Sequence, residues 1–79
     1  MSTDHWRMQL NNYVQRNGLQ NFVSWTQPVP SGPRNAPTWT IAVFFNGTEY
    51  GRGSSTRLDS AKEIAAELCL KALWSQRGL

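Results

Sequence analysis

Residues 38–54, Thr-Trp-Thr-Ile-Ala-Val-Phe-Phe-Asn-Gly-Thr-Glu-Tyr-Gly-Arg-Gly-Ser, decide the fold class. The first eight are mostly β-branched or aromatic, and such side chains favour strands. Their alternation places Trp39, Ile41, Val43 and Phe45 on one face of the strand. Asn46-Gly47 is the dipeptide preferred in a two-residue type I′ turn. The sequence therefore predicts a β-hairpin whose second strand runs from Thr48 to about Ser54.

The glycines and prolines in and before this hairpin indicate where strands are interrupted or replaced by a loop. Gly51 and Gly53 flank Arg52, where they either weaken the strand or allow another backbone to approach closely. Upstream, residues 21–27 alternate and contain strand formers, so they predict a further strand. Four prolines and Gly32 punctuate residues 28–37, a composition that predicts a loop, not an interior strand or a helix.

A helix is predicted on each side of the strands. Residues 3–17 bring four apolar side chains to one face, with Thr3 or Asp4 as the cap and Gly18 as the stop; the four are Trp6, Leu10, Tyr13 and Val14. The second helix is expected from about Thr56, which forms a capping-box pattern with Asp59, to Gly78. Its expected core stripe consists of Ala61, Ile64, Ala65, Leu68 and Ala72.

The predicted order is therefore α-β-β-β-α in a single domain, residues 1–79. It defines an α+β fold with a three-stranded antiparallel sheet and two helices packed on one face.

Composition narrows the class of protein. The chain has 79 residues and a net charge of +3, too small an excess to indicate a nucleic-acid ligand by itself. Its one cysteine, Cys69, cannot form an internal disulfide, and with the one histidine, His5, it is too little for a zinc site of about four ligands. We expect Cys69 to be a small core residue and His5 to lie at the surface. No apolar run approaches the roughly 18 residues that span a membrane, and the first residues do not resemble a signal peptide.

These features predict a protein of a reducing, intracellular compartment, cytoplasm or nucleus, with no cofactor, no metal and no membrane partner. They also predict no enzymatic activity, because the five acidic residues are scattered and no nucleophile has a paired base with an orienting group.

Three segments resemble the double-stranded RNA-binding domain family, in order and on the expected elements. Residues 10–15, Leu-Asn-Asn-Tyr-Val-Gln, are similar to the Leu-Asn-Glu-Tyr-x-Gln of that family's first helix. Residues 32–39, Gly-Pro-Arg-Asn-Ala-Pro-Thr-Trp, are similar to its Gly-Pro-x-His-x-x-x-Phe segment. Gly51-Arg52-Gly53 followed by Ala61-Lys62-Glu63-Ile64-Ala65-Ala66 is similar to Gly-x-Gly and then Ala-Lys-x-x-Ala-Ala. The resemblance covers about Trp6 to Trp74.

The resemblance implies non-catalytic binding of double-stranded RNA by shape, across two minor grooves and the phosphates between them, over about 16 base pairs. It assigns three contact regions. The first helix contributes a stripe of Met8, Asn11, Asn12 and Gln15. The loop contributes Gly32, Pro33, Arg34 and Asn35. The start of the second helix contributes Ser60 and Lys62, with Arg52 and Arg57 expected to replace missing lysines.

The chain departs from the family pattern in three places. Leu58 and Asp59 stand where the family has phosphate-binding lysines, Asn35 stands where it usually has histidine, and the loop is about three residues longer because of residues 27–30. The sparse positive charge predicts modest RNA affinity.

These departures keep a second function open, that of a protein-interaction or homodimerisation module with weak or no RNA binding. The third strand is expected to be an exposed sheet edge, which readily pairs with another chain. The residues expected to form a partner surface are Trp25 and Phe44 on the outer sheet face and Leu70 and Trp74 on an outward helix face. Asp59, Glu63 and Glu67 are expected to form a solvated acidic stripe.

Overall fold

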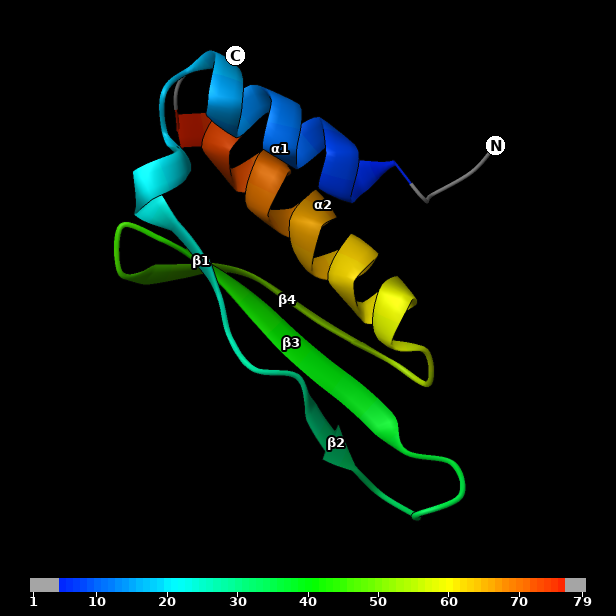
Figure 1. Cartoon of the computed structure of the whole chain (residues 1–79). Coiled ribbons are helices and arrows are strands. Elements are labelled where there is room, and N and C mark those ends of the chain that lie inside the picture. The colour runs from blue at the N-terminus through cyan, green and yellow to red at the C-terminus, as the bar shows by residue number, and fades with distance from the viewer. Residues whose placement is uncertain (1–4, 77–79) are drawn as a thin grey trace.

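In the computed structural model, which describes residues 5–76, the chain runs from a helix through a sheet to a second helix (Figure 1). The helices are α1 (Trp6–Arg16) and α2 (Leu58–Gln76), and a short 3₁₀ turn, η1 (Gln20–Phe22), follows α1. The strands are β1 (Val23–Trp25), β2 (Val29–Ser31), β3 (Thr38–Phe45) and β4 (Thr48–Ser55). The α+β class and the element order are confirmed, because β1 and β2 are two parts of one interrupted edge strand.

Strand β3 is the centre of the antiparallel sheet. β4 pairs with one edge of β3, in which Ile41 lies opposite Gly53, and β1 and β2 both pair with the other edge. Asn46 and Gly47 join β3 to β4 with positive φ angles of 53° and 81°, as a type I′ turn requires. The predicted hairpin is confirmed.

A β-bulge separates β1 from β2. Trp25 lies opposite Val43 and Val29 lies opposite Thr40, so four steps along the edge strand face three steps along β3. Thr26 spans the irregularity: its amide donates to the Ala42 carbonyl over 2.9 Å, and its hydroxyl accepts from the Ala42 amide over 3.0 Å. The side chain thus supplies a ladder bond that the backbone has lost.

The prediction that all of residues 28–37 form a loop is wrong. Val29–Ser31 pairs with β3 as a strand, and the connection to β3 is residues 32–37. Pro30 is tolerated because its strand lies at the sheet edge, where an absent N–H breaks no ladder. Val29 and Pro30, two of the residues expected to lengthen the loop, belong to β2, and the bulge takes up one further residue of the edge strand. The expected extension therefore does not lie in the connection to β3.

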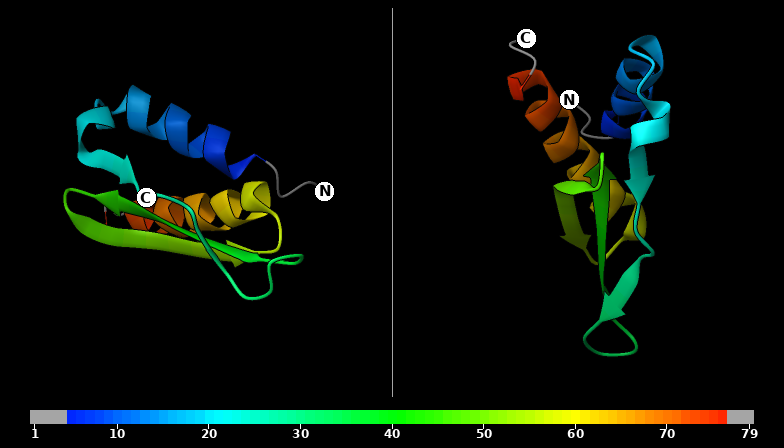
Figure 2. Two further views of the ribbon diagram at one scale, coloured as in Figure 1. Left: turned by 60° about the horizontal axis from the view of Figure 1, so that its bottom comes forward. Right: turned by 90° about the vertical axis from the view of Figure 1, so that its left-hand side faces the viewer.

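Both helices lie on the same side of the sheet (Figure 2). α2 packs against β3 and β4, and α1 packs beside α2. The core joins Leu10 and Val14 of α1 to Ile41 and Val43 of β3, and to a broad arc of α2 consisting of Ala61, Ala65, Ala66, Cys69, Leu70 and Leu73. The predicted face of α1 is confirmed, with Trp6 and Tyr13 partly buried against this core.

The predicted core stripe of α2 is only partly correct. Ala61 and Ala65 are buried, but Ile64 and Leu68 are 39% and 46% exposed, whereas Leu70 is fully buried. Apolar residues occur on nearly every side of this helix, so periodicity alone does not fix its orientation. Packing against both α1 and the sheet selects the arc that contains Leu70.

The helix ends also differ from the predictions. α1 begins at Trp6, and Thr3 and Asp4 lie outside the described residues, as does Gly78. Gly18 follows α1 with φ 66°, which confirms the predicted stop. α2 begins at Leu58, two residues after Thr56. The hydroxyl that serves this turn belongs to Ser55, whose Oγ accepts from the Arg57 amide over 3.3 Å.

Cys69 is a buried core residue, as predicted. Burial raises the pKa of its thiol from 9.0 to about 11. At pH 8 we expect the native protein to react with a thiol reagent such as 5,5′-dithiobis(2-nitrobenzoate) on the order of 100-fold more slowly than the urea-unfolded chain, because the thiolate is the reactive form. Absorbance at 412 nm follows the reaction. Equal reaction rates in the native and the unfolded protein would contradict the prediction.

The raised pKa of Cys69 also affects stability. It stabilises the fold at pH values below the unfolded pKa, and this contribution is lost as the pH rises from about 9 to about 11.

Candidate nucleic-acid interface

The polar stripe of α1 is exposed and lines a hollow on the outer side of the helix. Met8, 60% exposed, shares it with Asn11, Asn12 and Gln15, and Arg7 and Glu63 complete the lining. The helical spacing that buries Leu10 and Val14 turns this stripe away from the core. It therefore presents amide donors and acceptors, and one flexible apolar side chain, to any ligand that lies along α1.

The loop between β2 and β3 is a compact turn with exposed side chains. Gly32 has φ 87°, a conformation that favours glycine, and the Ala36 amide donates to the Pro33 carbonyl over 3.2 Å. Arg34 and Asn35 are exposed at its tip. The loop and the first turn of α2 lie toward the same end of the molecule in Figures 1 and 2.

The start of α2 divides its side chains between two hollows. Arg57 and Ser60 line one with Arg7, Asp59 and Glu63. Lys62 lines another, between the helices and β1. Neither Arg57 nor Lys62 forms an ion pair with any other residue in the range 5–76, so both charges are available to a phosphate.

Arg52 is not brought together with these residues. It lies opposite Ala42 in the register, one residue from Gly51 and Gly53, which face α2. Because strand side chains alternate, Arg52 points off the opposite face of the sheet. There its guanidinium donates to Glu49 over 2.6 Å. This hydrogen bond and the charge of Arg52 lower the pKa of Glu49, while the same pair raises the pKa of Arg52.

Arg7 is the residue that sequence reasoning missed. Its Nε donates to Glu63 Oε2, and its Nη1 lies 3.9 Å from Asp59 Oδ1. Arg7 lines both the hollow along the α1 stripe and the hollow that contains Arg57 and Ser60, so it connects the α1 stripe to the start of α2. The contact joins residues 56 positions apart, and no local pattern signals such a pairing.

The predicted acidic stripe of α2 is wrong in its central residue. Glu63 is only 5% exposed. Its Oε1 accepts from the backbone amides of Trp6 and Arg7 over 2.8 and 3.2 Å. These are the free amides at the start of α1, so a side chain of α2 caps the N-terminus of α1.

The predicted partner surface is not assembled. Leu70 is in the core. Trp25 shares the helix-facing side of the sheet with its partner Val43, whereas Phe44, opposite Ser24, lies on the other face. Trp74 is partly buried against the core. The exposed apolar pair of α2 is Ile64 and Leu68 instead.

Features of other site classes are not found among the described residues. Across residues 5–76, no three His, Cys, Asp or Glu side chains gather as a metal site requires. Neither helix of that part of the chain has the length and apolar character needed to cross a bilayer.

The fold and its exposed polar surface define a small α+β module with two helices on one side of a sheet and a polar helix stripe, a turn and a helix start available for contact. A family model for the double-stranded RNA binding motif matches residues 6–73, and the chain belongs to this family. No curated protein sequence matched the chain. Members of the family are generally non-catalytic RNA-binding modules, and the match supports double-stranded RNA as the class of ligand.

Proposed function

We propose that this chain binds A-form RNA duplexes by shape and without catalysis. The α1 stripe lies in one minor groove, Arg34 and Asn35 enter the next, and Arg57, Ser60 and Lys62 contact the phosphates between them. The observation that carries the proposal is the exposure of three polar regions, distant in sequence, on a fold of the double-stranded RNA-binding family. An intracellular location, as expected from the free thiol of Cys69, belongs to the same proposal.

The charges favour modest affinity. Arg57 and Lys62 are free of ion pairs within residues 5–76, but Asp59 lies in the same hollow as Arg57, and Glu63 partly neutralises Arg7. Recognition therefore depends on hydrogen bonds to 2′-hydroxyls as well as on charge. Such contacts favour RNA over DNA because only RNA carries the 2′-hydroxyl.

Arg57→Ala combined with Lys62→Ala is expected to weaken binding of a roughly 20-base-pair RNA duplex and to make it less dependent on salt. Each lost phosphate contact should reduce the slope of log K against log salt concentration by about 0.7–0.9, the range known for DNA. Fluorescence anisotropy at several salt concentrations measures both effects. Arg52→Ala is the matched control, because it removes a cation from the opposite face of the sheet and should leave the affinity within about twofold of the unaltered protein, a difference of under 0.5 kcal/mol.

A same-sequence DNA duplex and single-stranded RNA complete the experiment. Binding restricted to duplex RNA supports the proposal. Absence of duplex RNA binding at low salt, or an equal loss of affinity in the Arg52 control, overturns it.

A second candidate function is a protein-interaction or homodimerisation module. It is favoured by the exposed Ile64 and Leu68 on α2, which lie on the helix that packs against the edge strand β4. An edge strand offers unpaired backbone groups to another chain. A concentration-dependent dimer in sedimentation velocity, together with no binding of duplex RNA, would select this function over the first.

A further inference from the structure

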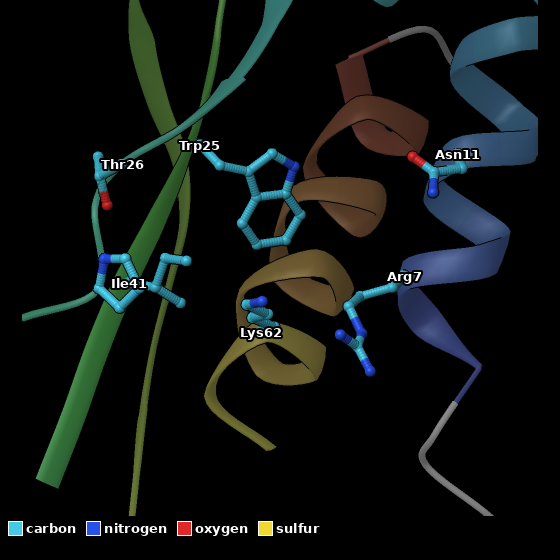
Figure 3. A pocket seen from close by; sticks show the side chains of 7 residues that line it. Arg7, Asn11, Trp25, Thr26, Ile41 and Lys62 are labelled. Atoms are coloured by element: carbon cyan, nitrogen blue, oxygen red, sulfur yellow. The ribbon is translucent and has the colours of Figure 1, made fainter. Parts of the chain in front are cut away.

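A hollow of about 350 Å³ lies between α1, α2 and β1. It borders the surface contacts proposed above and shares Asn11 and Lys62 with them. Trp25 of β1 and Ile41 of β3 line it from the sheet, Lys62 lines it from α2, and Arg7 and Asn11 line it from α1. Figure 3 shows the indole of Trp25 between the sheet and the helices, with Arg7 and Asn11 on the facing side. We refer to this space as the Trp25 hollow.

The bulge and the helix arrangement together produce the hollow. Trp25 is on the helix-facing side of the sheet because it pairs with Val43, yet α2 packs over β3 and β4 and α1 packs beside α2. No helix therefore covers the β1 side of this face fully, and the indole remains 38% exposed. Thr26 and Pro28 of the bulge form the adjacent rim.

The lining combines an aromatic face with positive charge. Lys62 has no ion pair within the described part of the chain, and Arg7 keeps a half-exposed guanidinium beside Glu63. An aromatic ring stacks on a planar base, and a cation binds a phosphate. A hollow of this volume is within the range of small-ligand sites, about 300–1,000 Å³. The lining therefore suits a nucleotide.

The position of the hollow indicates where that nucleotide comes from. Arg7 and Asn11 line both the Trp25 hollow and the hollow of the α1 stripe. A duplex that lies along α1 passes beside the Trp25 hollow. A paired base cannot reach the indole, and extruding a base costs a few kcal/mol, least where the base is already unpaired.

We propose that the Trp25 hollow binds a single unpaired nucleotide of an RNA duplex, with its base stacked on Trp25 and its phosphate held by Lys62 and Arg7. This inference rests on the proposed function and deepens it: the protein prefers duplexes that contain a bulged nucleotide near the α1 contact. Asn11, at the rim, donates to or accepts from the edge of the base.

Two RNA duplexes that differ only in one unpaired adenosine at the centre test the proposal. The unaltered protein is expected to bind the bulged duplex about tenfold more tightly than the perfect one, the lower part of the range for one stacked base. Trp25→Ala should abolish this preference while leaving the affinity for the perfect duplex within about twofold, less than 0.5 kcal/mol. Trp25→Tyr should keep most of the preference, because it keeps an aromatic face.

Controls separate the hollow from the rest of the surface. Phe22→Ala removes an exposed aromatic side chain outside the hollow and should leave the preference unchanged. Circular dichroism melting establishes that each variant folds. Equal binding of the two duplexes by the unaltered protein, or a preference that survives Trp25→Ala, overturns the hollow proposal alone. Binding of neither duplex overturns the proposed function together with it.

Discussion

Gly53→Ala is expected to lower the free energy of unfolding by about 3 kcal/mol, near the upper end for overpacking of a core. A Cβ atom at Gly53 would clash with the backbone carbonyl oxygen of Ala61 and would lie 2.8 Å from the Ala65 amide nitrogen. These are backbone atoms of α2, and they cannot move aside without shifting the helix from the sheet. A helix shift would also disturb the contacts of Ala61 and Ala65 with the core.

The loss would be large for a chain of this size. Domains of 60–100 residues lose about 4–8 °C in melting temperature per kcal/mol, so the midpoint should fall by roughly 12–24 °C for 3 kcal/mol. Urea unfolding followed by circular dichroism gives the free energy. Gly51→Ala should behave similarly, since a Cβ there would clash with the Ala65 carbonyl.

Ser54→Ala is the matched control on the same strand. Ser54 is exposed, and its hydroxyl forms a hydrogen bond with that of Thr40 across the sheet, over 2.9 Å. Its removal should cost no more than about 1 kcal/mol. A Gly53→Ala variant as stable as the Ser54 control would show that α2 is not held against β4 by close backbone approach.

The two glycines illustrate how far local sequence patterns determine this fold. Their spacing around Arg52 allowed either a weakened strand or a close approach, and only the position of α2 selects the second. By contrast, alternation and turn chemistry in residues 38–48 sufficed to predict the β3–β4 hairpin, since both act between neighbours. The bulge at Thr26 escaped prediction because Pro28 and Pro30 indicate a loop unless the strand is known to be an edge.

In the candidate site too, local sequence patterns predict some residues correctly, and contacts between distant segments decide the others. The exposed stripe of α1 follows from helical periodicity, because Leu10 and Val14 fix which side is buried. The position of Arg52 on the far face follows from strand alternation once its neighbours are known to face α2. Arg7 was not assigned from the sequence, and the prediction that Trp25 lies on the outer sheet face is wrong. The surroundings of both residues depend on contacts among α1, α2, β1 and β3 that are remote in sequence.

Glu63 is the clearest of these remote contacts, and Glu63→Ala is expected to lower the free energy of unfolding by about 2–3 kcal/mol. Its carboxylate accepts from the amides of Trp6 and Arg7 and from the Arg7 side chain. Hydrogen bonds to a charged group contribute about 1.5–3 kcal/mol, and loss of the acceptor leaves partly buried donors unsatisfied. Because the Arg7 side chain is 40% exposed, water replaces part of its lost interaction, and the estimate stays below that for a fully buried pair.

Glu67→Ala provides the matched control, one turn further along the same helix. Glu67 pairs with Lys71 at the i,i+4 spacing, and the Lys71 side chain is 55% exposed. Such pairs contribute about 0.3–0.5 kcal/mol. Glu63→Gln should fall between the two alanine variants, because its amide oxygen still accepts from one backbone amide but carries no charge for Arg7.

Hydrogen exchange shows which part of the protein loses stability in Glu63→Ala, and by how much. In Glu63→Ala the amides of Trp6 and Arg7 should lose protection, while those of β3 and β4 follow only the global loss of stability. Glu63 also holds Arg7 at the border of the α1 stripe and the Trp25 hollow, so the folded variant should bind duplex RNA more weakly as the start of α1 frays. Unchanged exchange at the start of α1, or a stability equal to that of Glu67→Ala, would show that the buried carboxylate is not what fixes α1 against α2.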